Sequence, residues 1–346
     1  MKGYDEEPIE AVCPVCGCTR GKQLWSVDSR QSARHFVLPE ADPQRHEELA
    51  AHIASLWQSD RCRVVRCDCC RFCYSWPFVA GDARFYALAY PNHGYPKWKW
   101  EYDAALDWIA EGQTSERNLL EIGAGKGAFA AALINCGFPK ERIVCTEFSA
   151  GGRAAINKLG IRCLPDDVRN LSGPDWDGRF DLVCMFQVIE HMDRLDELFA
   201  RLAVLIRPGG RLIAAVPNPA MIEFNELNGA LRDMPPCHVG RWNVGCFEQI
   251  GRRFGFERIK SAVEPGRWMS MAAQFVGYRL LQRSQTPDSW ANRAFRVRRR
   301  PLRRAAQAAM MFVVAVGAVR PLLRLHRGLG NALIVCLERQ RRPEQG

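Results

Sequence analysis

A glycine-rich turn followed by an acidic residue carries the clearest chemical signal in this sequence. An apolar run enters three glycines in Leu119-Leu-Glu-Ile-Gly-Ala-Gly-Lys-Gly127, and a second apolar run, Ile143-Val-Cys-Thr146, ends at Glu147. Glycines allow a sharp turn and a close approach of the backbone to a ligand, and a carboxylate after the second strand can bind ribose hydroxyls. The pattern predicts a strand, turn, helix and strand that bind a cofactor containing adenosine.

Two adenosine cofactors fit this pattern. Gly123, Gly125 and Ala128 match the loose dinucleotide fingerprint, with Glu147 as the ribose acid. Glu121 lies two residues before the first glycine, where a carboxylate would repel a pyrophosphate. The same carboxylate suits S-adenosylmethionine, because that molecule carries an ammonium and a sulfonium group and no phosphate.

Downstream segments favour S-adenosylmethionine. Residues 180–192 predict a buried strand that enters a polar turn, and residues 202–219 predict a helix, a turn at Pro208-Gly-Gly210, a strand and an exit loop. This order resembles the class I S-adenosylmethionine-dependent methyltransferases, and within them the small-molecule and sugar methyltransferases. The resemblance covers about residues 95–265, with a closing strand at Leu333–Leu337. It implies an α/β fold with a seven-stranded Rossmann-like sheet.

The resemblance also implies which residues bind the cofactor. Phe148 could cover an adenine face, and Asp167 stands where the family places an acceptor for the adenine amine, with Asp166 as the adjacent alternative. Gln187 ends the fourth strand, where cofactor and acceptor should meet. The full implied set is Glu121, Gly123, Gly125, Gly127, Glu147, Phe148, Asp167 and Gln187.

Three further residues are candidates for catalysis. By the resemblance, the pair Glu190 and His191 lines the active site and sometimes assists proton transfer or metal binding, although His191 could instead cap a helix or hydrogen-bond a loop. His238 resembles the histidine of a loop over the active site. Histidine ordinarily titrates near neutral pH and so suits a general base, which makes His238 the preferred one. The alternative is that His238 only packs beneath Arg241 and Trp242.

Two segments are expected to recognise the acceptor. Residues 218–234 form a long connection after the fifth strand, and loops of that length in compact domains are usually functional. Residues 90–100 combine aromatic and basic side chains that could stack on a ring of the acceptor, or pack against the core.

Eight of the cysteines lie before residue 74, and four of them form two Cys-x-x-Cys pairs. Two such turns can complete a closed tetrahedral zinc site, which has a structural role. The long separation of the pairs is explained by an inserted helix that begins at Asp42-Pro43, with apolar residues at 49, 53, 56 and 57. The resembled group carries such an N-terminal zinc-knuckle module, although Arg71 replaces the usual glycine. The predicted zinc ligands are Cys13, Cys16, Cys67 and Cys70.

Other readings of these cysteines stay open. Cys18, Cys62, Cys69 and Cys73 could supply a different ligand set, and buried thiols without a metal are a further alternative. Redox chemistry of the Cys-x-x-Cys kind needs a strand-to-helix setting that this segment lacks. Fifteen cysteines without a secretory signal predict thiols in a reducing compartment, not disulfides, and a cytoplasmic protein.

The net charge of +10 is concentrated near the C-terminus, where seven arginines lie between Arg293 and Arg304. Residues 305–319 are apolar except for Gln307, and fifteen residues fall short of the roughly twenty that span a bilayer. Residues 293–325 could therefore contact an anionic membrane surface. A hairpin helix buried against the core or a second subunit is the alternative.

Composition and length indicate a multidomain globular protein. It has 346 residues, of which 47% are hydrophobic and 25% charged. We expect a cysteine-rich zinc module (1–85), a methyltransferase core (86–266), a basic and apolar helical insertion (267–328), and a closing strand with a tail (329–346).

The predicted function is in-line methyl transfer from S-adenosylmethionine to a small molecule, sugar or lipid-linked glycan, with a histidine base. A nucleic-acid methyltransferase is less favoured, because the tetrapeptide that accepts exocyclic amines is missing and Pro217-Asn-Pro219 does not replace it. A binding protein that retains the fold without catalysis is a third possibility.

Overall fold

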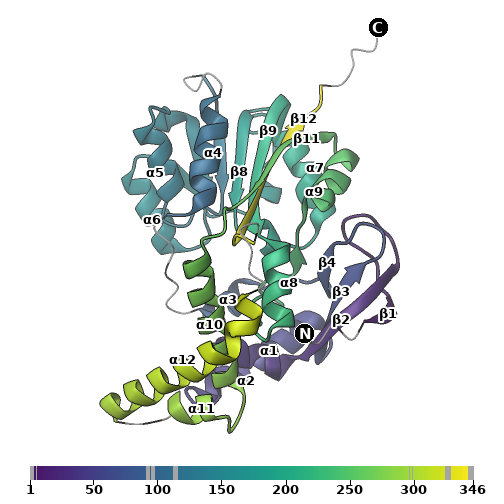
Figure 1. The fold of residues 1–346 in the computed structure, drawn as a ribbon. Helices are drawn as coiled ribbons and strands as arrows, with labels where there is room; N and C mark the ends of the chain where they lie inside the picture. The colour runs from purple at the N-terminus through teal and green to yellow at the C-terminus, as the bar shows by residue number, and fades with distance from the viewer. Residues whose placement is uncertain are drawn as a thin grey trace.

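The chain forms a large sheet, a smaller sheet and an outlying group of helices (Figure 1). The structure is a computed structural model that describes residues 4, 6–90, 94, 98–111, 116–295, 297, 299–323 and 329–341. Two of the seven arginines of the basic cluster, Arg296 and Arg298, lie outside these residues, as does most of the aromatic segment 91–97.

The large sheet has seven strands, and its order is β11-β12-β9-β8-β5-β6-β7. The five strands from β9 to β7 are parallel, and β12 is antiparallel to both of its neighbours, β9 and β11. The predicted α/β fold with a seven-stranded Rossmann-like sheet and a closing strand is therefore confirmed. Its strands are β5 (Leu119–Ile122), β6 (Ile143–Thr146), β7 (Arg162–Leu164), β8 (Phe180–Phe186), β9 (Ile206–Pro217), β11 (Phe256–Val263) and β12 (Ala332–Arg339).

The central strands are buried along their whole length because helices cover both faces of the sheet. Figure 1 shows α4, α5 and α6 on one face and α7 and α9 on the other. One boundary differs from expectation. The helix predicted to reach Arg207 ends at Leu205, and the glycine pair predicted as a turn lies inside β9. The helices are α4 (Trp100–Ala110), α5 (Ala128–Asn135), α6 (Ala150–Lys158), α7 (Leu195–Leu205) and α9 (Val244–Arg253).

The small sheet joins the N-terminal segment to the rest of the chain. Its order is β1-β2-β3-β4-β10, and every pair is antiparallel. The edge strand β10 follows β9 by more than twenty residues in sequence, so the chain returns from the large sheet to complete the small one. These strands are β1 (Glu7–Glu10), β2 (Arg20–Asp28), β3 (Arg61–Cys67), β4 (Cys73–Trp76) and β10 (Gly240–Arg241).

Three N-terminal helices pack beside this sheet: α1 (Ser29–Phe36), α2 (Pro43–Trp57) and α3 (Ala83–Ala89). The helix predicted after Asp42-Pro43 is confirmed as α2. The Asp42 side chain accepts a hydrogen bond from the Arg45 N–H, which caps the first turn. Leu49 and Ile53 are fully buried, as their helical spacing indicates.

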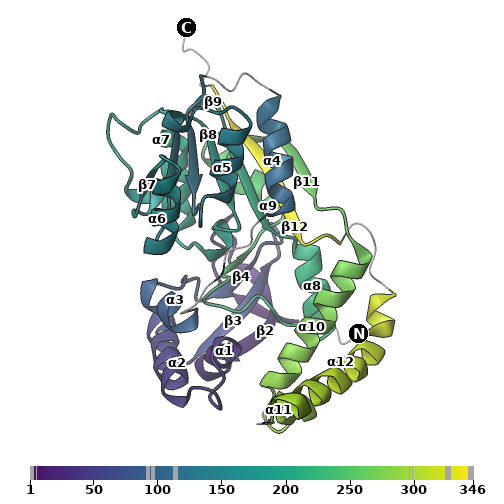
Figure 2. The same cartoon turned by 90° about the vertical axis from the view of Figure 1, so that its left-hand side faces the viewer.

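The remaining helices lie beyond the ends of the large sheet (Figure 2). The connection predicted as a loop over 218–234 contains a helix, α8. Asn218 caps it by accepting a hydrogen bond from the Ala220 N–H, and Pro219 occupies its first turn, where a missing N–H costs nothing. These helices are α8 (Pro219–Leu227), α10 (Trp268–Gln285), α11 (Trp290–Phe295) and α12 (Arg300–Leu322).

Candidate active site and cysteine cluster

The glycine-rich turn follows β5 and begins α5. Gly123, Gly125 and Gly127 have φ angles of 69°, 59° and 77°, in the left-handed region that glycine adopts without strain. The N–H of Gly123 donates to the carbonyl of Thr146 over 2.9 Å, which ties the turn to the end of β6. The turn thus lies at the carboxyl ends of neighbouring parallel strands, where α/β sheets bind ligands.

Glu147 supports this turn from the next strand. Its Oε2 accepts a hydrogen bond from the Gly125 N–H at 2.9 Å, and its Oε1 accepts one from the Ser149 N–H at 2.8 Å. Gly152 of α6 packs directly beneath, since a Cβ added there would lie 2.7 Å from the Glu147 Cγ and collide with the Gly125 carbonyl. The carboxylate is therefore held in place beside the predicted cofactor loop.

Glu121 is a buried carboxylate at the mouth of the turn. Its Oε2 has no hydrogen-bond partner among the described residues. Burial raises the pKa of Glu121 to about 8, against the lowering effect of the Lys99 charge. A ligand that brings a positive charge and N–H donors to this position would satisfy the carboxylate, as the ammonium group of S-adenosylmethionine could.

The turn after β8 contacts the glycine turn. A Cβ on Gly123 would lie 2.6 Å from the Val188 Cγ2, so these two segments touch. Gln187 directly follows β8 with a φ of 60°, and its Nε2 donates to Oε1 of the buried Glu101 at 3.1 Å. Burial also raises the pKa of the Glu101 carboxyl. Sequence reasoning missed Glu101, although it lies directly after the aromatic and basic segment.

Glu190 and His191 lie in the short 3₁₀ helix Ile189–His191, immediately after Val188. The Glu190 carboxylate is almost fully buried, and neither of its oxygens has a hydrogen-bond partner in the described structure. Burial raises the pKa of Glu190 to about 7. An unsatisfied buried carboxylate of this kind is costly and suits a bound group that donates hydrogen bonds.

His191 is hydrogen-bonded to the loop between α8 and β10. Its Nδ1 lies 2.7 Å from the Cys237 carbonyl oxygen and 3.1 Å from the Tyr86 hydroxyl. Because a carbonyl only accepts, Nδ1 carries the proton of the neutral ring. Burial and the neighbouring His238 lower the pKa of His191 to about 3, so the ring is neutral at cellular pH. The structure thus gives His191 the loop contact that we considered as an alternative to a catalytic role.

His238 is paired with Asp233, a residue that sequence reasoning missed. The His238 Nδ1 lies 2.5 Å from the Asp233 Oδ1, and Asp233 is 2% exposed. Burial would raise the pKa of Asp233, but the hydrogen bond and charge of His238 outweigh burial and hold it well below the usual range. The rings of His191 and His238 meet edge to face with centroids 4.6 Å apart. The two predicted histidines therefore share one site.

Cys237 belongs to the same site. Its Sγ lies 3.6 Å from the Tyr90 hydroxyl and 3.6 Å from the His191 Nδ1. The ligand atoms of His191, Cys237 and His238 all lie within 4.8 Å of one another, which is compatible with a metal ion as well as with proton transfer. Tyr86 and Tyr90 come from α3 and its end, so the N-terminal segment contributes hydroxyls to the site.

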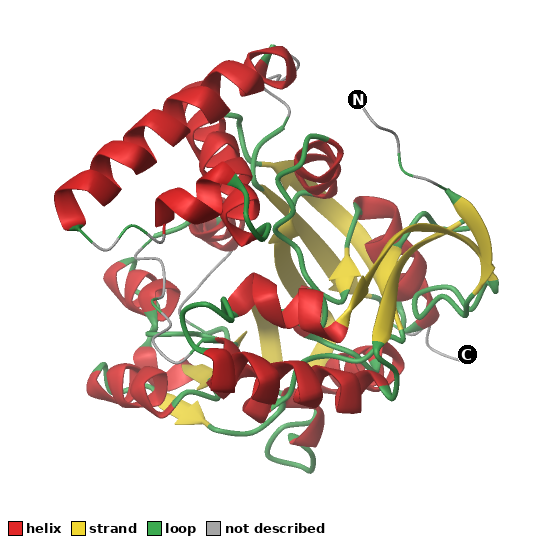
Figure 3. Cartoon of the chain, turned by 90° about the horizontal axis from the view of Figure 1, so that it is seen from below, coloured by secondary structure: helices red, strands yellow, loops and turns green. Residues whose placement is uncertain are grey.

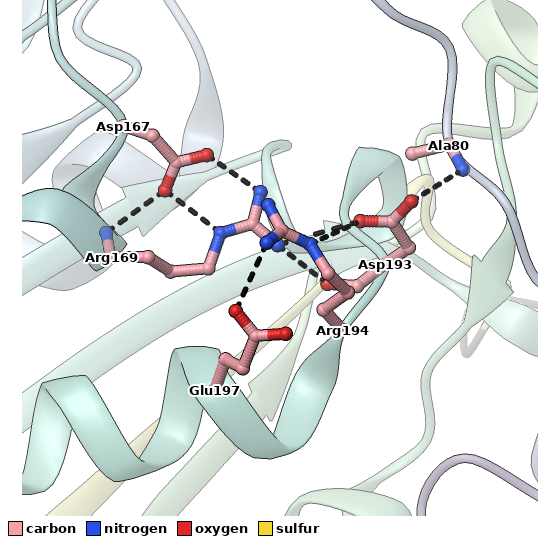
Figure 4. A network of polar contacts seen from close by, with 6 residues as sticks. All are labelled: Ala80, Asp167, Arg169, Asp193, Arg194 and Glu197. Atoms are coloured by element: carbon pink, nitrogen blue, oxygen red, sulfur yellow. Dashed lines mark hydrogen bonds and ion pairs between the residues drawn. The ribbon is translucent and has the colours of Figure 1, made fainter.

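Two predicted cofactor residues have surroundings unlike those of the glycine turn: Asp167 pairs with an arginine, and Phe148 is exposed. Both Asp167 oxygens accept hydrogen bonds from Arg169, which lowers the pKa of Asp167 despite its partial burial, and Asp166 is exposed. Arg169 also contacts Asp193, which accepts a hydrogen bond from the Ala80 N–H (Figure 4). Phe148 is 73% exposed beside Glu147. An adenine contact by either Asp167 or Phe148 stays a prediction.

The two Cys-x-x-Cys turns meet and bring four sulfurs together. The Cys13 and Cys70 sulfurs are 3.6 Å apart, as are those of Cys16 and Cys67, and all four lie within 4.8 Å. Zinc–sulfur bonds of about 2.3 Å in a tetrahedron place sulfurs about 3.8 Å apart. The donor set fits a zinc ion, and the structure by itself is compatible with a metal at this cluster.

Both turns have the same backbone conformation. The N–H of Gly17 donates to the Cys13 carbonyl, and the N–H of Arg71 donates to the Cys67 carbonyl. Gly17 has a φ of 73° and Arg71 a φ of 64°. Arg71 thus adopts the left-handed conformation of the glycine that it replaces, at a cost of about 1 kcal/mol.

The other cysteines of this segment lie outside the four-sulfur cluster, although the sulfurs of Cys18 and Cys69 form a second group with Cys67 within 4.8 Å. Cys18 and Cys69 form a disulfide with a Cα–Cα distance of 6.4 Å, so the expectation of free thiols alone is wrong at this pair. They are 51 residues apart in sequence and become neighbours because Cys18 follows the first turn and Cys69 lies within the second. Cys62 lies in a separate apolar cluster with α2, and Cys73 is half-buried at the start of β4.

Comparison with known proteins identifies residues 97–271 with a family described as a methyltransferase domain. A mitochondrial ubiquinone biosynthesis O-methyltransferase of Dictyostelium discoideum is 23% identical over 119 residues, which cover 31% of this chain and 37% of that protein. The chain thus spans little more than a third of that relative's length.

Solved structures of low identity were also found. Phosphoethanolamine N-methyltransferase 2 of Haemonchus contortus is 14% identical, with 70% of this chain and 53% of that chain covered and a TM-score of 0.44. The YcgJ protein of Bacillus subtilis is 16% identical, with coverages of 70% and 99% and a TM-score of 0.44. Because these TM-scores are low, the assignment of the chain to the methyltransferase family depends on the family match over residues 97–271.

Proposed function

We propose that this protein methylates a hydroxylated small molecule, sugar or lipid-linked glycan. The chain belongs to the methyltransferase-domain family and is a class I S-adenosylmethionine-dependent methyltransferase. His238 is the general base of this reaction. The observation that carries the proposal is the contact between the glycine turn and the turn after β8, which leads directly to Glu190 and to the two histidines. In this proposal, cofactor and base belong to one continuous site.

The cofactor half of the proposal depends on five residues. Glu121 would pair with the ammonium group, and Gly123, Gly125 and Gly127 allow the backbone to approach the ligand closely. Glu147 would bind the ribose hydroxyls in exchange for one of its present hydrogen bonds to the loop. When bound, S-adenosylmethionine supplies an electrophilic methyl group.

The acceptor half depends on proton removal. Asp233 accepts a hydrogen bond from the Nδ1–H of His238, which leaves Nε2 free to take the proton of an acceptor hydroxyl as its oxygen attacks. The neutral His191 and the Tyr86 hydroxyl border this position and would orient the acceptor. Such positioning of the reacting groups supplies a large part of the rate of a displacement reaction.

The character of the acceptor follows from Glu190. Both of its carboxylate oxygens are buried and have no hydrogen-bond partner within the described residues; Nε2 of the neutral His191 lies 3.9 Å from Oε1. Acceptor hydroxyls would donate hydrogen bonds to them, which favours a molecule with several hydroxyl groups over a purely apolar one. This supports a sugar or glycan among the acceptors predicted from the sequence.

The cysteine cluster is proposed as a structural zinc site. Four thiolates would complete the coordination of the ion and leave no position for a substrate. The cluster is linked to the rest of the chain by Cys246 of α9, whose Sγ contacts the Cys70 carbonyl oxygen at 3.5 Å. We expect the site to stabilise the N-terminal sheet and, through it, the tyrosines of α3. A cytoplasmic location, as predicted from the sequence, completes the proposal.

Nucleic acid is a less suitable acceptor. The described part of the basic cluster lies on and before α12, a helix whose exposed side chains are mainly apolar. Binding along a nucleic-acid backbone needs basic side chains without such an apolar surface.

The function is tested first by calorimetric titration of the metal-replete protein with S-adenosylmethionine and, separately, with NADH. Micromolar binding of S-adenosylmethionine that is lost in Glu147→Ala supports the cofactor assignment, whereas binding of NADH alone would overturn it. Transfer of an isotope-labelled methyl group to hydroxylated acceptors, and its loss in His238→Gln, then tests the base. Methyl transfer that survives in His238→Gln at the wild-type rate would exclude His238 from that role.

A further inference from the structure

One stripe of α12 packs against the protein. Met310, Val314 and Ala318 recur every four residues and are buried. Met310 and Val314 cluster with Leu280 of α10, and Ala318 clusters with Phe275 of the same helix. Figure 3 shows α12 as a long helix at the edge of the molecule.

The opposite face of α12 is exposed and apolar. Exposed fractions are 71% for Phe312, 57% for Val316, 51% for Val319 and 78% for Leu323, which directly follows the helix. With the exposed Ala305 and Ala309, these residues alternate in spacings of three and four and so share one side of the helix. A surface helix ordinarily carries polar and charged residues on that side. Here the described structure leaves it uncovered.

The chain segment that carries this face has only positive charges. Between Asp288 and Glu338 the sequence contains ten arginines, no lysine and no acidic residue. Arg299, Arg300, Arg303 and Arg304 lie at the start of α12 and Arg320 near its end, and none forms an ion pair with a described acidic residue. An apolar strip bordered by unpaired arginines is complementary to a surface that is apolar inside and anionic at its boundary.

The length of the apolar part decides how α12 would meet such a surface. Among the described helices, α12 is the one with the length and composition to cross a membrane. Its apolar residues 305–319, however, extend only about 22 Å, which is short of a hydrocarbon core of about 30 Å. One face of α12 packs against α10 and the opposite face is exposed. Such a helix suits a position parallel to the membrane surface, in the region between lipid headgroups and hydrocarbon.

We infer that the face of α12 formed by Ala305, Ala309, Phe312, Val316, Val319 and Leu323 rests in the interface of an anionic lipid bilayer. The arginines at both ends of the helix contact the lipid phosphates. The protein is thus bound to one leaflet and does not span the membrane.

The same helices connect the membrane face to the candidate active site. Phe275 of α10 clusters with Ala230 of the loop after α8, and Gln282 of α10 accepts a hydrogen bond from the Leu231 N–H at 2.7 Å. Asp233 follows in that loop. Bound to a bilayer, the protein would therefore hold its acceptor loop beside the lipid surface, which favours a lipid-linked acceptor. This last step rests on the proposed function, and the binding of α12 to lipid does not.

The test is co-sedimentation of the full chain with vesicles of phosphatidylcholine alone and with 30% phosphatidylglycerol, at low and high salt. We expect at least tenfold tighter binding to the anionic vesicles, weakened by salt. The double substitution Phe312→Glu/Val316→Glu should lower that binding at least tenfold. The matched control Val204→Glu changes an exposed valine on α7 and should bind like the wild type.

A triple substitution of Arg300, Arg303 and Arg304 by glutamine should reduce binding and most of its salt dependence. Equal binding to neutral and anionic vesicles, or no binding to either, would overturn the inference. A dimer in light scattering that dissociates in Phe312→Glu/Val316→Glu, without vesicle binding, would assign the face to a second copy instead. Titration with S-adenosylmethionine on the same samples reports folding and the cofactor site, so failure of the proposed function is recognised separately.

Discussion

The Nδ1 atom of His238 lies 2.5 Å from an oxygen of the buried Asp233, and this pair organises the candidate active site. A carboxylate held ionised in a buried position accepts a hydrogen bond from one imidazole nitrogen and determines the tautomer of the ring. The second ring nitrogen is then available as a base. The edge-to-face contact with His191 adds a neutral histidine beside it.

Substitution of His238 by glutamine is expected to lower kcat by about 10²–10⁴-fold, because the acceptor proton loses its base. Asp233→Asn should also lower kcat, since the amide can donate a hydrogen bond to Nδ1 and so favour the wrong tautomer. Neither change should alter the dissociation constant of S-adenosylmethionine by more than about threefold. Initial rates and calorimetry on the same preparations check this. A larger loss of rate in His191→Gln than in His238→Gln would move the base to His191.

The packing of Gly152 against the cofactor loop can be tested with a neighbouring control. Gly152→Ala places a methyl group against the Glu147 side chain and the Gly125 carbonyl, and should weaken S-adenosylmethionine binding by about 1–3 kcal/mol through the shifted loop. Gly151→Ala meets no atom within 4 Å and should bind like the wild type. Calorimetric titration measures both. Equal affinities in the two variants would mean that the position of Glu147 does not matter for the cofactor.

Substitution of one cysteine of the cluster should abolish metal binding and lower the free energy of unfolding. We expect about one zinc per chain by elemental analysis, and loss of that zinc in Cys67→Ser with a fall in the free energy of unfolding of about 3 kcal/mol or more. Cys136→Ser, at an exposed thiol outside the cluster, should change neither quantity. A metal-free wild-type protein of unchanged stability after dialysis against a strong chelator would contradict a structural metal.

Glu190 predicts a pH dependence of stability. Burial raises its pKa in the folded protein from 4.5 to about 7, so between these values the folded state keeps a proton that the unfolded chain releases. The free energy of unfolding therefore falls as pH rises from about 4.5 to 7, by about 3 kcal/mol from this group. Glu190→Gln should remove that contribution. The free energy of unfolding of the variant, relative to that of the wild type, should therefore rise between pH 5 and pH 8.

Urea unfolding at pH 5 and pH 8 measures the effect of Glu190. Glu257→Gln, at an exposed position of β11, should leave the difference between the two pH values unchanged. If wild type and Glu190→Gln lose the same stability between pH 5 and 8, the carboxylate is ionised in the folded protein and has a partner that the described contacts do not include.

The parts of the site that could be predicted are those in which one short sequence segment contains all the residues of the pattern. The glycines after Leu119–Ile122 and the acid after Ile143–Thr146 depend on local backbone geometry and on strand order, and both appear in the sequence as spacing. The same holds for Asp42-Pro43, which marks the start of α2. The helix α8 was missed because its cap lies in a segment otherwise typical of a loop.

The sequence by itself determined the fold class, the glycine turn with Glu147 on the next strand, and the two cysteine pairs, since periodicity, glycine conformation and ligand spacing are local properties. Only the tertiary structure decided that Asp233 supports His238, that Tyr86 of α3 reaches His191, and that one face of α12 stays uncovered. Tyr86 and His191 are separated by 105 residues, and their contact depends on how two sheets and their helices pack. Such distances in sequence carry no periodic signal, because packing is settled by the summed contacts of the whole chain.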